Sequence, residues 1–163
     1  MKLNDKMIKM LNDQMNLEYN SAWLYRSLAV WAADNNFDGS HKWLKVQAAE
    51  EVSHAEKFYN FLLEKGEKPE FKDLEGSSKD YSKLVDIFKA ALEHEYLITS
   101  EIKKLYKEAR DEEDYETEKF LDWFIHEQVE EEANFTEIVE KLELCGDNVG
   151  ALFMYDTVLG HRE

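Results

Sequence analysis

Six polar residues stand at one repeated spacing in this chain, and together they have the chemistry of a metal site. In each half, a glutamate is followed 33 residues later (51 − 18) by a second polar residue and three further on by a third. The two sets are Glu18, Glu51 and His54, then Glu95, Gln128 and Glu131. All three offsets between the halves equal 77 residues (95 − 18, 128 − 51, 131 − 54). Two copies of one helical hairpin would direct these donors at a single point, as in the dimetal sites of helical bundles.

Four long amphipathic segments would position these residues. Apolar residues recur every three or four positions, which predicts bundle helices over about 4–33, 38–65, 80–109 and 113–144. Near the middle of each segment, the apolar position is taken by a glutamate or by the Gln128 and Glu131 pair. A carboxylate that faces a core costs several kcal/mol unless something compensates it. Five such residues at matched depth indicate a shared partner, and a pair of metal ions is the simplest one.

The turns support the matched depth. The midpoint of 18 and 51 falls in the loop-forming residues 34–36, and the midpoint of 95 and 128 falls in the acidic stretch 110–114. Residues 66–79 are rich in Gly, Pro and Ser and predict the one long connection. Extended, they would reach about 46 Å, enough to run beside a helix of about 42 Å. A long crossover between the second and third helices is therefore possible, although a short return also fits.

A short fifth helix is predicted over about 148–159. Gly146 is a natural end for the fourth helix, and Asp147 or Asn148 could cap the next one. The segment is too apolar for a lone surface helix. We expect it to pack on a neighbouring subunit, with packing on its own bundle as the alternative.

Composition limits the class of protein. The chain has 163 residues, which predicts one domain over 1–163 with its bundle at about 4–144. The net charge of −16 argues against nucleic acid as a partner. The single cysteine, Cys145, rules out an internal disulfide or a cysteine-rich metal site. No leading signal segment and no run of about 18 apolar residues is present, so we expect no membrane association and a cytoplasmic location.

The spacing suggests a role for each residue of the first half. Glu51 and His54 form a Glu-x-x-His motif on one helix face, and carboxylate plus imidazole suits iron, manganese or zinc. We expect Glu18 and His54 to hold the first metal. Glu51, flanked by both halves, is the expected bridging ligand.

The second half is predicted to be a looser site. Glu95 and Glu131 would hold the second metal, without an imidazole. Gln128 cannot ionise, so we expect it to hydrogen-bond near the second metal or near a bound oxygen species. Tyr25 lies seven residues after Glu18 on the same stripe and could donate to a ligand carboxylate or supply an electron, although an ordinary core tyrosine is an equal alternative.

A second acidic cluster accompanies the first. Glu50, Glu127 and Glu130 lie beside Glu51 and Glu131, and Glu50 and Glu127 are themselves 77 residues apart (127 − 50). These residues could form a third metal position or a solvated helix face, and the sequence leaves both open.

As a set, these residues resemble a known centre. The match comprises Glu18, Tyr25, Glu50, Glu51, His54, Glu95, Glu127, Gln128 and Glu131. They resemble the ferroxidase centre of the non-haem ferritins of bacteria and archaea. The resemblance implies an all-α, ferritin-like four-helix bundle with the long crossover, assembled into a hollow shell of twenty-four subunits. It also implies oxidation of Fe(II) by dioxygen or peroxide and storage of a ferric oxyhydroxide mineral.

The resemblance also assigns ligands. It implies di-iron ligands at Glu18, Glu51, His54, Glu95 and Glu131, with Gln128 close by and Tyr25 beside the centre. The third iron site would use Glu50, Glu127 and Glu130 and share Glu131.

Differences from other ferritin-like proteins indicate which of them this chain does not resemble. Bacterioferritins carry a second Glu-x-x-His, where this chain has Gln128 and Glu131, and a haem-binding Met where this chain has Val52. We therefore expect no haem. A rubrerythrin-type peroxidase would often add a cysteine-rich domain, which one cysteine excludes.

Two rival functions remain open on the sequence. One is a different di-iron enzyme, a peroxidase or oxygenase that works as a monomer or dimer. The other is a non-enzymatic acidic bundle that binds no stoichiometric iron.

Overall fold

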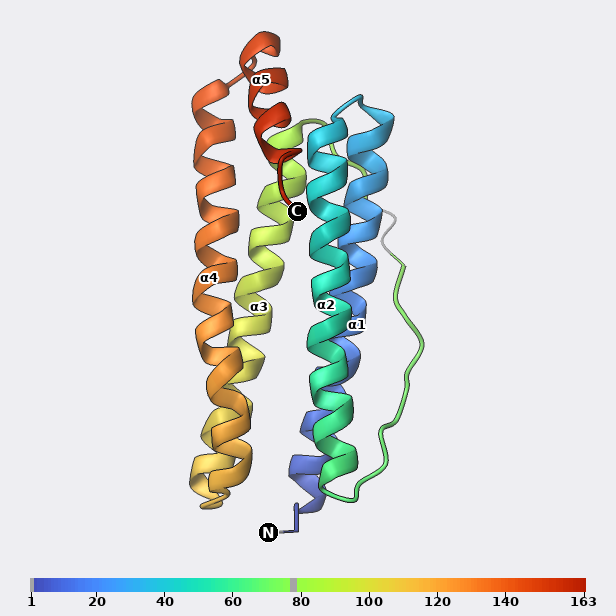
Figure 1. Cartoon of the computed structure of the whole chain (residues 1–163), viewed down its shortest axis with the longest axis vertical. Coiled ribbons are helices and arrows are strands. Elements are labelled where there is room, and N and C mark those ends of the chain that lie inside the picture. Colours follow the sequence, from blue (N-terminus) through green and yellow to red (C-terminus); the bar gives the residue numbers. More distant parts are fainter. Residues whose placement is uncertain (1, 77–78) are drawn as a thin grey trace.

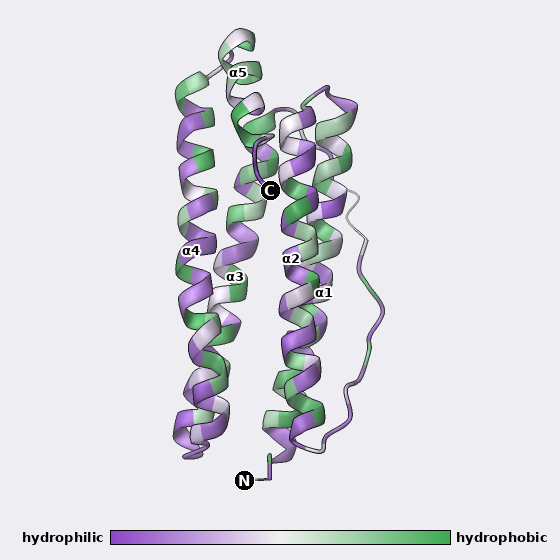
Figure 2. Cartoon of the chain, in the orientation of Figure 1, coloured by the Kyte–Doolittle hydropathy of each residue, from purple (hydrophilic) through white to green (hydrophobic). Residues whose placement is uncertain are grey.

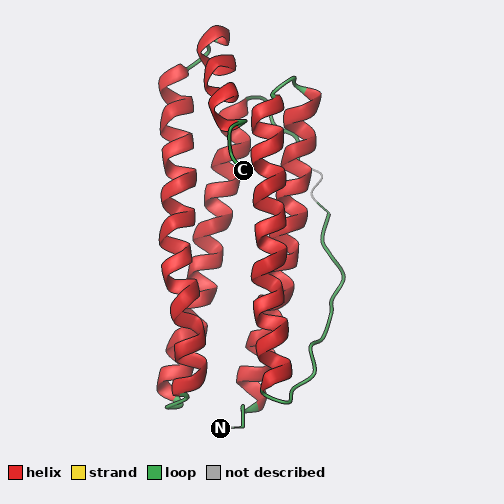
Figure 3. Ribbon diagram, in the orientation of Figure 1, coloured by secondary structure: helices red, strands yellow, loops and turns green. Residues whose placement is uncertain are grey.

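The chain forms four long helices and one short one (Figures 1 and 3). The computed structural model describes residues 2–76 and 79–163, and this part of the chain contains no strand. The helices are α1 (Asp5–Asp34), α2 (Asp38–Glu64), α3 (Leu84–Asp111), α4 (Tyr115–Cys145) and α5 (Val149–Leu159). The prediction of an all-α four-helix bundle with a short fifth helix is confirmed. Within the described residues, no helix is both long and apolar enough to cross a membrane.

Tight turns join the helices of each hairpin where the repeat places them. Asn36 and Glu113 both adopt the left-handed backbone region, with φ of 65° and 55°. Glu113 therefore cannot continue a helix, and α4 begins two residues later than the sequence pattern indicates. Asp114 caps it, since its side chain accepts a hydrogen bond from the Thr117 amide at 3.1 Å.

A long crossover joins α2 to α3 and runs along the bundle (Figure 1). Side chains one helical turn apart on α1 hold its extended backbone. Asn12 accepts from the Glu70 amide at 2.7 Å. Asn16 accepts from the Lys72 amide at 2.8 Å and donates to the Glu70 carbonyl at 2.7 Å. These bonds give the backbone of the crossover hydrogen-bond partners that an extended segment outside a sheet would otherwise lack. The prediction of a long crossover, rather than a short return, is confirmed.

The third helix begins at Leu84, later than the expected start near residue 80. The Tyr81 carbonyl accepts a hydrogen bond from Trp31 Nε1 at 2.9 Å, which holds this segment against α1. The Lys83 amide donates to the side chain of Asp86 at 3.0 Å and so marks the first turn. Positions 77–78 of the predicted connection lie outside the described residues.

The fifth helix packs back on its own bundle. Buried Asp156 accepts hydrogen bonds from the amides of Gly39 at 2.9 Å and Ser40 at 2.7 Å. Helix α2 has no side-chain cap of its own at Phe37, so Asp156 supplies both the cap and a favourable negative charge. A Cβ at Gly39 would lie 1.7 Å from the Asp156 carbonyl oxygen, which explains the glycine there. A contact of α5 with a neighbouring subunit stays a prediction.

A buried polar layer lies between two hydrophobic clusters. One cluster surrounds Phe88 and Phe135, and the other surrounds Phe58 and Phe124. Figure 2 shows hydrophobic and hydrophilic residues sharing each long helix. The buried polar residues at the intervening level are Gln14, Glu18, Ser21, Gln47, Glu51, His54, Glu95, Gln128 and Glu131. The fold therefore carries the six repeated residues into its interior at one level.

Candidate metal centre

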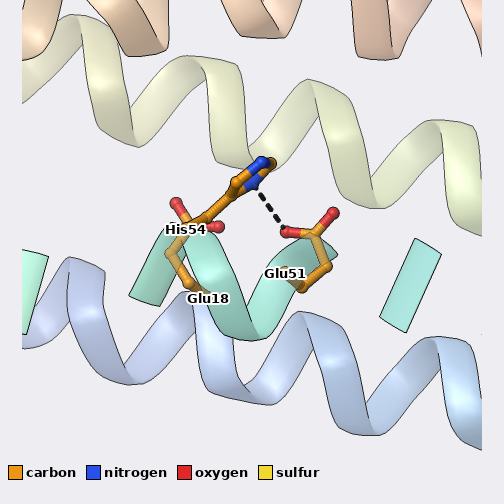
Figure 4. A group of neighbouring side chains, drawn as sticks. All are labelled: Glu18, Glu51 and His54. Carbon is orange, nitrogen blue, oxygen red and sulfur yellow. Dashed lines mark ion pairs between the residues drawn. The ribbon is translucent and has the colours of Figure 1, made fainter. Parts of the chain in front are cut away.

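Helices α1 and α2 bring the first predicted ligands together (Figure 4). Glu18, Glu51 and His54 each offer a donor atom, and these atoms lie within 4.8 Å of one another. All three side chains are buried, with relative exposures of 1%, 2% and 4%. His54 Nδ1 lies 3.3 Å from Glu51 Oε2. Two carboxylates and an imidazole at this separation could hold one transition-metal ion.

A second group shares one of these residues. Donor atoms of Glu51, Glu95 and Glu131 also lie within 4.8 Å of one another, and all three side chains are buried. Glu51 thus belongs to both groups, which is the placement expected of a carboxylate that bridges two ions. The α3 and α4 half contributes no imidazole to this group, so the two halves are unequal in the way the sequence predicts.

Burial and mutual repulsion perturb the carboxyl groups. Burial, with the nearby negative charge of Glu51, raises the pKa of Glu18 to about 8. Burial raises the pKa of Glu95 to about 7, and burial with the charge of Glu95 raises the pKa of Glu131 to about 7. The pKa of Glu51 is raised well above its usual range by burial and by Glu95 and Glu131. Cations would replace protons in such a cluster as they bind.

One carboxylate oxygen fits a cation particularly well. Glu18 Oε1 accepts a hydrogen bond from Gln14 Nε2 at 2.7 Å. Glu18 Oε2 is the only buried side-chain oxygen or nitrogen of the described residues without a hydrogen-bond partner. An unpaired buried acceptor is costly, and a metal ion between Glu18 and His54 would satisfy it.

Two glutamines, Gln14 and Gln47, orient the ligands, and the sequence pattern did not reveal them because they are not part of the 77-residue repeat. Gln47 Nε2 donates to Glu51 Oε1 at 2.8 Å and to Glu131 Oε2 at 2.9 Å, so it links both halves. Gln14 does the same for Glu18 alone. Each amide lies four residues before a ligand on its own helix, and that spacing was the available signal.

The 77-residue offset carries neither glutamine into the second half. The corresponding positions hold Ala91 and Phe124.

Gln128 and Tyr25 both contact Glu95. Gln128 Nε2 donates to Glu95 Oε2 at 3.0 Å and approaches Thr99 Oγ1 at 3.2 Å. The hydroxyl of Tyr25 donates to Glu95 Oε1, while its ring stacks on Phe135. Two donors therefore orient Glu95, and Tyr25 lies beside the second half of the site.

The structure brings together only part of the second acidic cluster. Donor atoms of His54, Glu127 and Glu131 lie within 4.8 Å of one another. Glu50 instead pairs with Arg162 near the C-terminus. Glu130 is exposed and belongs to none of the groups among the described residues.

His94 lies beside the site but outside the metal-capable groups of the described residues. Its Nε2 is 2.7 Å from Ser21 Oγ, and Ser21 Oγ also donates to the Leu17 carbonyl at 3.0 Å. Burial lowers the pKa of His94 to about 4. The imidazole is therefore neutral at physiological pH and helps pack α3 against α1.

Comparison with known proteins gives consistent matches over nearly the whole chain. A family model described as Ferritin-like domain matches residues 8–145. A probable bacterial non-heme ferritin-like protein of Haemophilus influenzae is 38% identical over 159 residues, which are 98% of this chain and 96% of that protein. The bacterial non-heme ferritin of Escherichia coli is 36% identical over 157 residues, covering 96% of this chain and 95% of that protein.

Solved structures agree with these sequence matches. An open pore ferritin from the hyperthermophilic archaeon Archaeoglobus fulgidus superposes with a TM-score of 0.98 and 36% sequence identity. The alignment covers 99% of this chain and 100% of that one. The similarity therefore includes both hairpins, the crossover and α5.

Proposed function

The chain belongs to the ferritin family, and on that premise we propose that it stores iron, oxidises Fe(II) at the buried centre and deposits a ferric oxyhydroxide mineral inside a hollow shell. The observation that carries the proposal is the sharing of Glu51 between two buried donor groups. The unpartnered Glu18 Oε2 supports it as well, because a bound metal ion would give this buried oxygen a partner.

The chemistry follows from the donor set. Each Fe(II) gives one electron, so two ions held side by side can reduce one dioxygen to hydrogen peroxide with uptake of two protons; peroxide itself is the alternative oxidant. A mainly carboxylate environment stabilises the more highly charged ferric product. We assign Glu18 and His54 to the first iron, Glu51 to both, and Glu95 and Glu131 to the second. The second iron, which lacks an imidazole, is the one expected to leave more readily.

Two neighbouring residues complete the proposed centre. Tyr25 orients Glu95 and is positioned to supply an electron, and Gln128 holds the same carboxylate from the other side. A third iron would bind beside Glu127 and Glu131, with Glu50 and Glu130 as its further predicted ligands. Haem has no part in the proposal, since Val52 stands where bacterioferritins have the haem-binding Met.

Assembly follows from the same family. We propose a shell of twenty-four copies in the cytoplasm, with iron and an oxidant as its partners. The solved ferritins that superpose on this chain support a shell, and the exposed apolar residues of α5, such as Met154 and Val158, suit a contact between copies.

The test adds Fe(II) in air to the purified protein and passes the product over a sizing column. We expect an amber absorbance that coelutes with a large shell. Replacement of Glu51 and His54 by Ala should abolish fast oxidation. The matched control replaces exposed Glu140 and His126 on α4 by Ala and should oxidise Fe(II) like the wild type.

Other results would favour the rivals. Iron oxidation by a monomer or dimer would indicate a different di-iron enzyme. Absence of stoichiometric iron, with no effect of the double substitution at the centre, would indicate a scaffold bundle.

A further inference from the structure

A cation supplied by the chain itself lies against the metal centre. Arg162 follows the end of α5, and its guanidinium pairs with Glu50 on α2. The same group lies over the Trp43 ring at 4.1 Å from its centroid. The Arg162 side chain is only 19% exposed, against 44% for Glu50. The guanidinium is therefore largely shielded from water by its contact with the Trp43 ring, while the carboxylate of Glu50 stays partly exposed.

A second bond connects Arg162 to the ligands. Its Nη1 donates to Gln47 Oε1 at 2.9 Å. Gln47 is fully buried, and its Nε2 donates to both Glu51 and Glu131. The amide can make all three bonds only with its oxygen toward Arg162 and its nitrogen toward the carboxylates. The guanidinium is thus held in a defined position, and a single residue, Gln47, links it to the proposed iron ligands Glu51 and Glu131.

Glu50 is close to the position of the proposed third iron. The pKa of Glu131 is raised mainly by burial and by the negative charge of Glu95, and the negative charge of Glu50 raises it further. Yet the group of donors beside the pair comprises His54, Glu127 and Glu131 without Glu50. Glu50 is instead paired with Arg162.

We propose that Arg162 is a positioning residue that fixes the number of ions the centre holds: it occupies Glu50 as a resident cation, and a third divalent ion binds tightly only after Arg162 leaves. This inference rests on the proposed function for the existence of the first two ion positions. The physical reason is competition, because Arg162 holds Oε2 of Glu50 and leaves that carboxylate only its other oxygen for a divalent ion. Repulsion between the two cations adds to it.

The experiment counts Co2+ bound to the metal-free protein under anaerobic conditions by equilibrium dialysis, so no turnover is involved. The wild type should bind two ions tightly and a third weakly. Arg162→Gln should tighten the third ion on the order of tenfold. Arg162→Lys, which keeps the positive charge, should bind the third ion as weakly as the wild type does. The double variant Arg162→Gln with Glu50→Gln should lose the tight third ion again.

A measurement on the wild type keeps the test independent of folding of the variants. Crystals soaked at high Co2+ should show a third anomalous peak beside Glu127 and Glu131 only where Arg162 has left Glu50. A third peak with the Arg162–Glu50 pair intact would overturn the inference, as would three tight ions in the wild type or an unchanged third affinity in Arg162→Gln. Failure of the wild type to bind the first two ions would instead refute the proposed function.

Discussion

At the scale of single residues, the centre is a set of buried carboxyl groups whose ionised form is disfavoured by burial and by their neighbours' negative charges. Glu18 shows this most clearly, since it is 1% exposed and has one oxygen without a hydrogen-bond partner. Without metal, protons relieve the repulsion among these groups. With metal, the same burial favours binding because the ions replace the protons.

The first prediction concerns pH. The pKa of Glu18 is about 8 in the folded protein against 4.5 ordinarily, so between these values the native state holds a proton that the unfolded chain has lost. The stability contributed by Glu18 is fully present below about pH 4.5 and is lost as the pH rises through 8. The melting temperature of metal-free Glu18→Gln, measured relative to that of the wild type, should therefore rise from pH 5 to pH 8.

Thermal melts at equal protein concentration check this. The pKa difference corresponds to about 3–4 kcal/mol over this pH range. A shift on the order of 10 °C is therefore expected, since about 1 kcal/mol moves Tm by roughly 2–4 °C at this chain length. Exposed Glu140→Gln serves as the control and should follow the wild type at every pH. A difference in Tm between Glu18→Gln and wild type that stays constant with pH would contradict the raised pKa.

The second prediction concerns Tyr25. Its buried hydroxyl donates to Glu95, so Tyr25→Phe removes one of the donors that orient this carboxylate. Affinity for the second Fe(II) should fall by about tenfold, and that for the first should change little. Anaerobic Fe(II) titration by calorimetry separates the two.

Tyr106→Phe is the matched control, because its hydroxyl donates to Asp122 at 3.0 Å, in the part-buried surface between α3 and α4. Equal weakening of both Fe(II) ions in Tyr25→Phe, or no weakening, would contradict the placement of Tyr25.

At the scale of elements, side chains of one helix hold a segment that has no regular structure. Asn12 and Asn16 bond the crossover backbone at Glu70 and Lys72. The crossover in turn sets the direction of α3, which enters beside α1 rather than reversing at the end of α2. The level of Glu95 relative to Glu18 therefore depends in part on contacts that lie outside the metal centre.

The third prediction tests this element. Asn16→Leu removes the acceptor of the Lys72 amide and the donor to the Glu70 carbonyl, at a cost of about 1–3 kcal/mol. Amide hydrogen exchange at Lys72 should accelerate strongly. Asn20→Leu removes a single, exposed bond to the Glu75 amide and should have a smaller effect. Equal protection of the Lys72 amide in Asn16→Leu and wild type would show that the crossover is held by other contacts.

Sequence periodicity predicted the elements well where their own residues determine them. The apolar stripes and the 77-residue repeat placed all four long helices and the level of Glu18, Glu51 and Glu95. The start of α3 was missed by about four residues because the Trp31 bond to the Tyr81 carbonyl is a tertiary contact that no local pattern reveals.

The same limit explains what was missed in the candidate site. Arg162 acts through a bond to Gln47, which is 115 residues away in sequence, and Gln47 reaches Glu131 over 84 residues; the repeat includes neither bond. Glu130 was assigned to the third iron site by resemblance, and this stays a prediction. The structure leaves its side chain exposed on α4 and outside the donor groups of the described residues.

At the scale of the whole molecule, the net charge of −16 matters for how iron arrives. An acidic surface raises the local concentration of Fe(II) and speeds encounter, while the buried centre sets affinity. The two contributions respond differently to salt, because screening acts mainly on solvent-exposed charges.

The fourth prediction follows from that difference. Raising ionic strength from about 0.01 M to 1 M shortens the screening length from about 30 Å to about 3 Å. The initial rate of Fe(II) oxidation at limiting iron should fall several-fold, while anaerobic affinity for the first two ions should change much less. Stopped-flow absorbance and calorimetry in the same buffers check both. A rate independent of salt would show that the surface charge does not guide iron.

The most direct test of the central claim is anomalous diffraction at the iron edge from crystals soaked anaerobically in Fe(II). The proposed centre predicts two peaks inside each bundle, one between Glu18, Glu51 and His54 and one between Glu51, Glu95 and Glu131. Glu51→Ala should remove or weaken both. A bundle interior without peaks at saturating Fe(II), or peaks that survive the loss of Glu51 unchanged, would contradict it.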